Sequence, residues 1–203
     1  MTEVFGGTAL SERDSRLAEL AEETRRLMEA IRTTAAAPEG LATAAETVAE
    51  ARAALETPGG DTGPQDSGRH ANPIVHNPVI GTANPYAPPL ATWTNGDGTV
   101  AGEVTLTQVH EGPPNAVHGG ISAMLLDQLL GHAVAAAGNI GMTAELTIRY
   151  RRPTPYGVPL RLLAWADGTD GRQTLARATL EAGGRVCVEA DGTFLRPRNL
   201  PSS

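Results

Sequence analysis

The chain has 203 residues, of which 40% are apolar, and this is enough for one soluble domain with a sizeable core plus an appendage. Its formal net charge of -7 argues against nucleic acid or an anionic membrane as the main partner. The single cysteine, Cys187, excludes a disulfide within the chain, and with neither a signal peptide pattern nor an apolar run long enough to span a membrane we expect a cytoplasmic protein.

Residues 1 to 57 predict a helical hairpin that extends the main domain. Ser11 and Asp14 have the spacing of an N-terminal capping box, and Pro38 suits the first turn of a second helix. The apolar stripes are rich in alanine and bury little area, so we expect the hairpin to dock on another surface. Residues 58 to 72 are rich in Gly, Pro and Asp and predict a flexible linker.

Residues 73 to 203 predict a single α+β domain. Alternating residues flank the turn sequence at 95–98, which indicates a β-hairpin. A further alternating run at 143–150 predicts a strand, and three more strands follow, with glycine-rich breaks at 168–171 and 183–184. One helix with about six mostly antiparallel strands is an α+β arrangement.

The helix of this domain follows a loop with two consecutive prolines and begins near Gly119 and Gly120. Apolar residues recur at helical spacings with no breaker among them, so we expect a helix buried on most sides. A lone carboxylate, Asp127, lies in its middle. Because burial of an unpaired carboxylate is costly, Asp127 either has a function or is held by an arginine or by an exposed face.

The glycines before this helix favour a functional interpretation of Asp127. The N–H groups of Gly119 and Gly120 lie at the helix N-terminus, where unpaired donors and the helix dipole stabilise developing negative charge. A carboxylate about two turns further along could serve a carbonyl held there. This combination indicates acyl-group chemistry.

Two segments, GPPNAVHGGISAMLLDQLLG and GMTAELTIRYRRPTPYG, resemble the hotdog-fold acyl-CoA thioesterases of the PaaI-like branch. The shared pattern is a His-Gly-Gly corner, then Asp127, then Thr143, then Tyr150 to Pro153, and the resemblance extends over about residues 73 to 197. It implies a hotdog fold, in which a roughly six-stranded antiparallel sheet wraps a long central helix. It also implies hydrolysis of acyl-CoA thioesters to a free acid and CoA.

The resemblance implies a role for each catalytic residue. The backbone N–H of Gly119, supported by Gly120, is expected to bind the thioester oxygen. Asp127 is expected to act as general base or as nucleophile, two roles that sequence does not separate. Thr143 is expected to position the attacking water or the carboxylate. His118 either orients the loop or contacts the thioester.

The resemblance also implies how the substrate binds and how the subunits assemble. Asn115 and the arginines Arg151, Arg152 and Arg172 are candidates for substrate binding, since planar guanidinium groups suit the CoA phosphates. No metal and no cofactor apart from the CoA of the substrate are implied. Subunits of this branch form homodimers with a continuous sheet and two shared active sites, and the dimers can pair again.

Two other functions remain open at the level of sequence. One is a hotdog dehydratase or hydratase, although the His-containing loop that such enzymes bring is not evident beside Asp127. The other is a non-catalytic acyl-CoA-binding module, for which a carboxylate inside the helix is not needed. Because every motif residue lies beyond the linker, we expect residues 1 to 57 to be dispensable for the chemistry.

Overall fold

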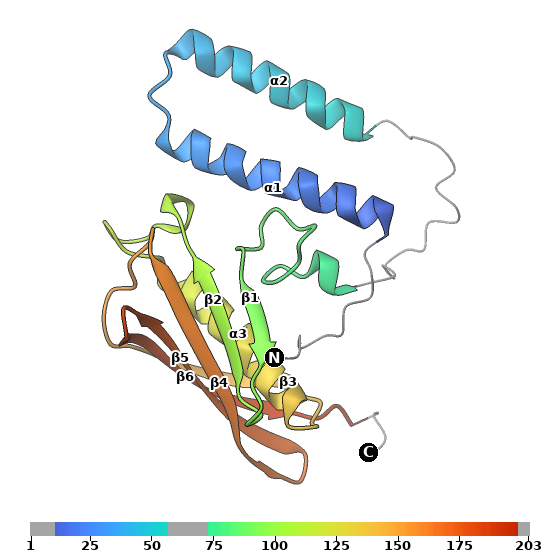
Figure 1. The fold of residues 1–203 in the computed structure, drawn as a ribbon, viewed down its shortest axis with the longest axis vertical. Coiled ribbons are helices and arrows are strands. Elements are labelled where there is room, and N and C mark those ends of the chain that lie inside the picture. The colour runs from blue at the N-terminus through green and yellow to red at the C-terminus, as the bar shows by residue number, and fades with distance from the viewer. Residues whose placement is uncertain (1–10, 57–72, 199–203) are drawn as a thin grey trace.

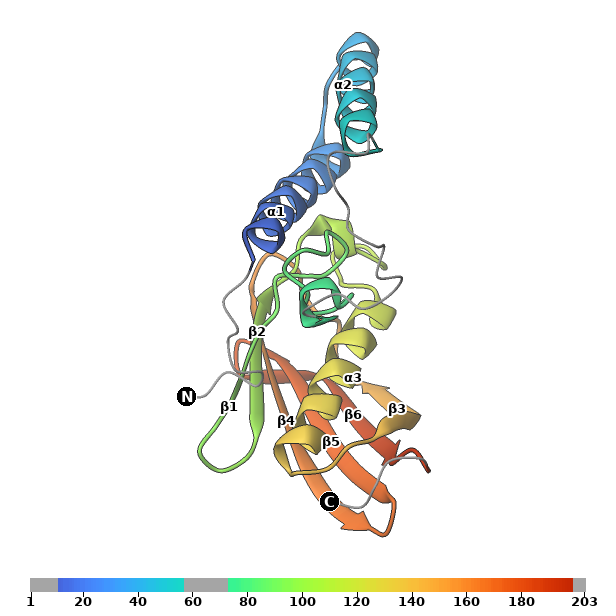
Figure 2. The ribbon, with the colours of Figure 1, turned by 90° about the vertical axis from the view of Figure 1, so that its right-hand side faces the viewer.

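The computed structural model describes residues 11–56 and 73–198, which form a curved sheet, a central helix and two N-terminal helices (Figure 1). Helix α3 packs on one face of the six-stranded sheet. Helix α1 lies across one end of this core, and α2 lies beyond α1, away from the sheet (Figure 2). The expected α+β hotdog architecture with an N-terminal hairpin is confirmed.

The sheet is antiparallel throughout and has the strand order β1-β2-β4-β5-β6-β3. The outer strands are therefore β1 and β3, and each pairs with one neighbour only. The strands are β1 (Ala91–Thr94), β2 (Val100–Thr105), β3 (Met142–Tyr150), β4 (Pro159–Asp170), β5 (Gln173–Ala182) and β6 (Arg185–Leu195).

The predicted break at 168–171 is shorter in the structure than the glycines suggest. Strand β4 continues to Asp170, and the pairing with β5 shifts register between Ala166 and Gly168. Gly168 has a φ of 144°, which a residue with a Cβ rarely adopts. Gly168 therefore marks a β-bulge inside the strand, and the turn itself lies at 171–172.

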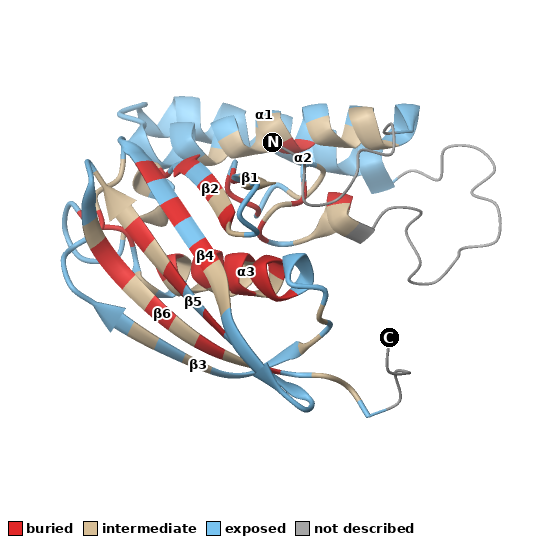
Figure 3. Cartoon of the chain, turned by 60° about the horizontal axis from the view of Figure 1, so that its bottom comes forward, coloured by how far each residue is buried: buried red, intermediate tan, exposed pale blue. Residues whose placement is uncertain are grey.

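Helix α3 (Gly119–Ala136) buries one face against the concave side of the sheet (Figure 3). Four leucines on this face, at positions 125, 126, 129 and 130, have no exposed surface. The opposite face is less covered than the apolar sequence predicts, because Met124 and Asp127 are only half-buried. Residues 121–134 are all buried or half-buried, so the expectation that most sides of the helix are buried is met, with the side of Met124 and Asp127 the least covered.

Helix α1 (Glu12–Thr33) begins as predicted, since the Ser11 hydroxyl accepts from the Asp14 N–H at 3.0 Å. It docks on η2 (Gln108–His110) and on the segment that follows η1 (Pro73–His76). Arg25 donates to the Asn84 carbonyl at 3.0 Å, and Arg32 forms a 2.6 Å ion pair with Glu111.

Helix α2 (Pro38–Glu56) is exposed along its whole length (Figure 3). Its apolar residues Leu41, Val48 and Leu55 are not covered by any part of the chain that the structure describes. The predicted linker at 58–72 lies outside the described residues.

Candidate active site

His118 caps the N-terminus of α3 and determines which N–H groups remain available there. Its ring Nδ1 accepts from the Gly120 N–H at 3.0 Å, and its carbonyl accepts from the Ile121 N–H at 3.0 Å. Within the described part of the chain, no acceptor is hydrogen-bonded to the Gly119 N–H. Gly119 is therefore the available donor of the His-Gly-Gly corner, and Gly120 is already engaged by the cap.

The end of β3 holds this corner in place from the other side. The Tyr150 hydroxyl donates to the Gly119 carbonyl at 3.0 Å. A Cβ added to Gly119 would lie 3.0 Å from the Tyr150 ring, closer than most side chains tolerate. The absence of a side chain at Gly119 thus allows the tyrosine to clamp the backbone next to the available donor.

The loop before the corner is fixed by its own hydrogen bonds. The His118 N–H donates to the His110 carbonyl at 2.8 Å, and the Val117 N–H donates to the Thr154 carbonyl at 2.8 Å. Asn115 has a φ of 62°, a left-handed conformation in which Asn is enriched, and its N–H donates to the Glu111 carboxylate at 2.8 Å. The backbone thus gives Asn115 a local role, and its contact with substrate stays a prediction.

A cleft of about 860 Å³ lies in front of the corner, lined by residues 113–120, Ser122 and 150–154. Arg151 and Arg152 both line this cleft. Arg151 pairs with Glu189 at 2.7 Å, and Arg152 donates to the Val186 carbonyl at 2.7 Å. Both guanidinium groups are thus bound by groups of β6 beside the His-Gly-Gly corner.

Arg172 does not join the other two candidate arginines. It lies in the β4–β5 turn, where its guanidinium donates to the Arg196 carbonyl. The neighbouring Gln173 pairs with Leu195, which in turn pairs with Met142 at the start of β3. Arg172 is therefore at the opposite end of β3 from Arg151.

Asp127 and Thr143 meet at that opposite end. The Thr143 hydroxyl donates to the Asp127 carboxylate at 2.9 Å, and the two residues are 16 positions apart in the chain. No arginine among the described residues forms an ion pair with Asp127. The structural alternative considered from sequence, a carboxylate held by arginine, is thus not observed in the described chain.

The Gly119 donor and the Asp127 carboxylate do not converge within one chain. They are eight residues apart in α3, which corresponds to about 12 Å along the helix axis. An oxyanion donor works at ~3 Å from the oxygen it stabilises, so one carbonyl cannot reach both groups. The expectation that Asp127 serves a carbonyl held by the Gly119 N–H therefore stays a prediction, and α3 of one chain does not by itself bring the two groups together.

A buried histidine on α3 was missed from the sequence. His132 is 2% exposed, and its Nε2 lies 2.7 Å from the amide nitrogen of Gln128, whose amide oxygen accepts from Asn77 at 3.3 Å. Burial lowers the pKa of His132 to about 4. The Gln-to-His spacing of four residues was a visible signal, because such residues are neighbours on a helix surface.

The sheet, the helix it wraps and the His-Gly-Gly corner together define a hotdog-fold protein, and comparison with known proteins gives its family. The sequence pattern described as Thioesterase superfamily matches residues 114–191. A crystal structure of a thioesterase superfamily protein is 34% identical, with a TM-score of 0.82, and the match covers 96% of this chain and 100% of that one. This chain belongs to the thioesterase superfamily.

Two details of the comparisons bear on the extent of the likeness. The match with the crystallised relative covers 96% of this chain, so both N-terminal helices are included in it. Acyl-coenzyme A thioesterase THEM4 of Xenopus laevis is 30% identical over 86 residues, which are 42% of this chain but only 38% of that protein. None of the helices in the described ranges is long and apolar enough to cross a bilayer.

Proposed function

We propose that this protein hydrolyses acyl-CoA thioesters to a free acid and CoA. The observation that carries the proposal is the pairing of Asp127 with the Thr143 hydroxyl on a half-buried helix face, with no cation bound to the carboxylate in the described chain. The family supports thioester hydrolysis, and the name of the Xenopus relative supports CoA thioesters as the substrate class.

Each residue has a stated part in this mechanism. The Gly119 N–H binds the thioester oxygen and stabilises the negative charge that develops there. As general base, Asp127 removes a proton from the attacking water, and this proton passes to the CoA sulfur as the carbon–sulfur bond breaks. As nucleophile, Asp127 displaces CoA and forms an acyl anhydride, which water then hydrolyses: the water supplies the oxygen of the free acid and the proton of the CoA thiol. On either route Thr143 holds the carboxylate. His118 keeps Gly120 and the helix start in position.

The two halves of the site are brought together by a second copy of the chain. Strand β3 has a free edge, with Tyr150 and the Gly119 corner at one end and Thr143 and Asp127 at the other. If two copies pair their β3 strands antiparallel about the strand centre, each corner lies beside the partner's carboxylate. An exposed, unpaired edge strand favours such pairing.

The same pairing accounts for the separated arginines. Arg151 and Arg152 lie at the corner end of β3, and Arg172 lies at the carboxylate end. In a pair of copies, Arg172 of one chain thus approaches the cleft that holds the other two arginines. All three then become candidates for the CoA phosphates, as the sequence predicts. A dimer of dimers stays a prediction.

Release of thiol from CoA thioesters separates this function from its alternatives. A dehydratase or hydratase changes the acyl chain and leaves the thioester intact, and a binding module releases nothing. The purified chain should therefore be assayed against a panel of acyl-CoAs with a thiol reagent. The absence of thiol release across the panel would contradict the proposed hydrolysis.

Asp127→Asn tests the catalytic assignment within the same assay. We expect turnover to fall by orders of magnitude, because the amide can neither attack carbon nor accept a proton from water. Asp170→Asn, which changes an exposed acid at the end of β4, is the matched control and should retain wild-type turnover. Near-normal turnover in a folded Asp127→Asn protein would remove Asp127 from the mechanism.

A further inference from the structure

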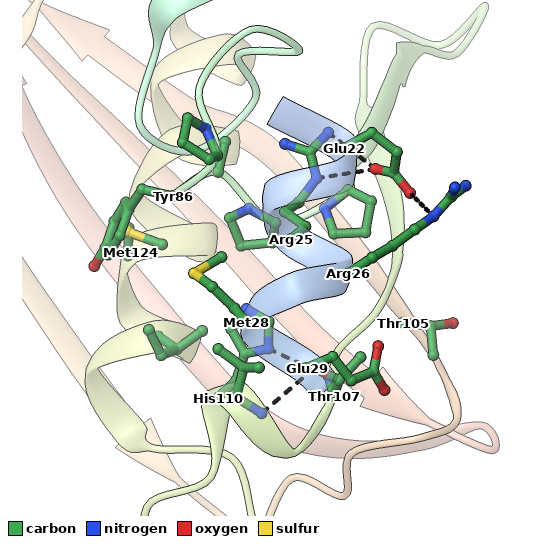
Figure 4. Close-up of a pocket in the computed structure, with 16 residues that line it drawn as sticks. Glu22, Arg25, Arg26, Met28, Glu29, Tyr86, Thr105, Thr107, His110 and Met124 are labelled. Atoms are coloured by element: carbon green, nitrogen blue, oxygen red, sulfur yellow. Dashed lines mark hydrogen bonds and ion pairs between the residues drawn. The ribbon is translucent and has the colours of Figure 1, made fainter. Parts of the chain in front are cut away.

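A second cavity lies between α1 and α3, outside the cleft at the His-Gly-Gly corner (Figure 4). Its volume of about 310 Å³ is near the lower end of the ~300–1,000 Å³ that ligand pockets occupy. Apolar side chains from α1, η2, α3 and the segment after η1 form its walls: Met28, Tyr86, Val109, Ile121 and Met124. Such a lining favours an apolar ligand.

The charged residues at this cavity are largely matched with one another. Arg25 is bound to Glu22 and to the Asn84 carbonyl, and its side chain is only 19% exposed. Arg26 forms an ion pair with Glu22 (Figure 4) and a second one with Glu23. Glu29 also lines the cavity and forms no ion pair in the described chain, so the acidic side chains of α1 at this wall offset both arginines and the wall does not favour an anionic ligand.

His110 contributes an uncharged group to the same wall. Its Nδ1 accepts from the Thr107 N–H at 3.2 Å, so the neutral ring carries its proton on Nε2. Burial lowers the pKa of His110, which favours the neutral ring at neutral pH. The cavity wall is therefore apolar or neutral where α3 and η2 meet.

The cavity begins one helical turn from the proposed catalytic carboxylate. Met124 lines the cavity, and Asp127 is three residues further along α3. Residues three apart are neighbours on the surface of a helix. A chain attached to a carbonyl beside Asp127 can therefore pass over Met124 into the cavity without crossing the sheet.

We propose that this cavity receives the acyl chain of the substrate, so that α1 sets the acyl-chain length that the enzyme accepts. This inference rests on the proposed function, since it assigns a substrate group to the same site. The preferred substrates are thioesters of unbranched, medium-length acyl groups with an apolar end. Met28 on α1 and Met124 on α3 both line the cavity, and their flexible side chains suit such a chain.

The test uses Met28→Trp in the full chain, which fills the cavity from the α1 side. The ratio of kcat/KM for decanoyl-CoA to that for butyryl-CoA should fall at least about tenfold, because loss of room for even one methylene costs ~10–200-fold. Ile31→Trp is the matched control: it lies on the same helix, is 65% exposed and does not line the cavity, and it should leave the ratio unchanged.

Met28→Ala keeps the test decisive if the tryptophan variant does not fold. It enlarges the cavity and should shift the preference from decanoyl-CoA toward longer acyl chains. An unchanged chain-length preference in either folded Met28 variant would overturn the inference. So would equal losses in Met28→Trp and Ile31→Trp.

Binding separates this inference from the proposed hydrolysis. Calorimetry should give tighter binding of decanoyl-CoA than of CoA, and Met28→Trp should abolish the difference while leaving CoA affinity intact. If this holds without any thiol release, the acyl site stands and the hydrolysis does not. If the wild-type protein hydrolyses thioesters but the Met28 variants keep the same selectivity, the hydrolysis stands and the acyl site is refuted.

Discussion

At the scale of single residues, Gly119 combines three properties at the first position of α3. Its N–H has no acceptor in the described chain, its carbonyl is bound by Tyr150, and a Cβ at this position would meet the tyrosine ring. The preceding His118 has φ −59° and ψ 132°, the extended conformation that a residue before proline prefers. Position 119 therefore tolerates proline in its backbone geometry, while proline removes the N–H.

Gly119→Pro, compared with Gly119→Ala, isolates the contribution of the N–H donor. Both substitutions add a Cβ against Tyr150, but only proline removes the donor. We expect kcat for Gly119→Pro to be about 10²–10³ lower than for Gly119→Ala, which is the usual cost of losing one oxyanion donor. Steady-state rates on one acyl-CoA, with thermal melts of both proteins, provide the measurement. Equal rates would assign the oxyanion contact to another group.

The sequence named the candidate residues, but it did not predict most of their hydrogen-bond partners. The motif named Gly119, Asp127 and Thr143, and the hydrogen bond between Thr143 and Asp127 is present. Sequence spacing alone did not show that His118 occupies the Gly120 N–H, since this depends on the ring orientation at the helix cap. The separation of about 12 Å along α3 follows from the spacing of eight residues, whereas the places of Gly119 and Asp127 at opposite ends of β3 depend on contacts with Tyr150 and Thr143 that spacing does not show.

At the scale of elements, α3 carries a polar row on the flank that faces residues 77–80. Asn77 donates to Gln128, whose amide meets His132, and Asn77 also accepts from the N–H groups of Val79 and Ile80. The row therefore joins the segment after η1 to the helix. His132 is its most buried member, so protonation of this ring should loosen the contact.

The protein should lose stability as the pH falls from about 6.5 toward 4. The pKa of His132 is about 4 in the folded chain, below its ordinary 6.5, so the unfolded chain takes up the proton first. Stability is then present above pH 6.5 and decreases toward pH 4, by at most roughly 3 kcal/mol for this group. Urea unfolding across this range at fixed protein concentration measures the slope. His132→Gln should reduce the slope but not remove it, because burial also lowers the pKa of His110, and an unchanged slope would refute the assignment.

The two N-terminal helices were predictable in position but not in their contacts. The capping residues and Pro38 identified where the helices begin. The surface that α1 covers depends on contacts between distant positions, such as Arg32 with Glu111, 79 residues apart, and Arg25 with Asn84, 59 residues apart. No local pattern contains these contacts. The prediction that residues 1 to 57 are dispensable for chemistry stays a prediction, but a role of α1 in chain-length selection would restrict it.

At the scale of the whole molecule, alternation predicted the strands, but it did not predict the complete order of the strands in the sheet. The glycine-rich turns indicated where β4, β5 and β6 are separated. Because short turns join them, neighbouring strands of this group pair with each other, as the structure shows. The position of β3 at the edge beside β6 requires a crossover that the local sequence does not encode. That placement matters most for the proposed function, since it leaves one edge of β3 without a partner strand in the described chain, with the Gly119 corner at one end and Asp127 with Thr143 at the other.

Mixed dimers test whether two copies share each active site. Gly119→Pro and Asp127→Asn chains, given different tags and co-expressed, should each be inactive alone. In a purified mixed dimer, one site has both defects and the other has an intact Gly119 from one copy and an intact Asp127 from its partner. We therefore expect about half of the wild-type rate, because a two-fold dimer has two equivalent sites.

The opposite pairing is the control, a wild-type chain with a chain that carries both substitutions. If the sites are shared, each of its sites has one damaged half, and the dimer should be inactive. If each chain held its own complete site, the results would be exchanged: the first dimer would be inactive and the second would keep about half of the rate.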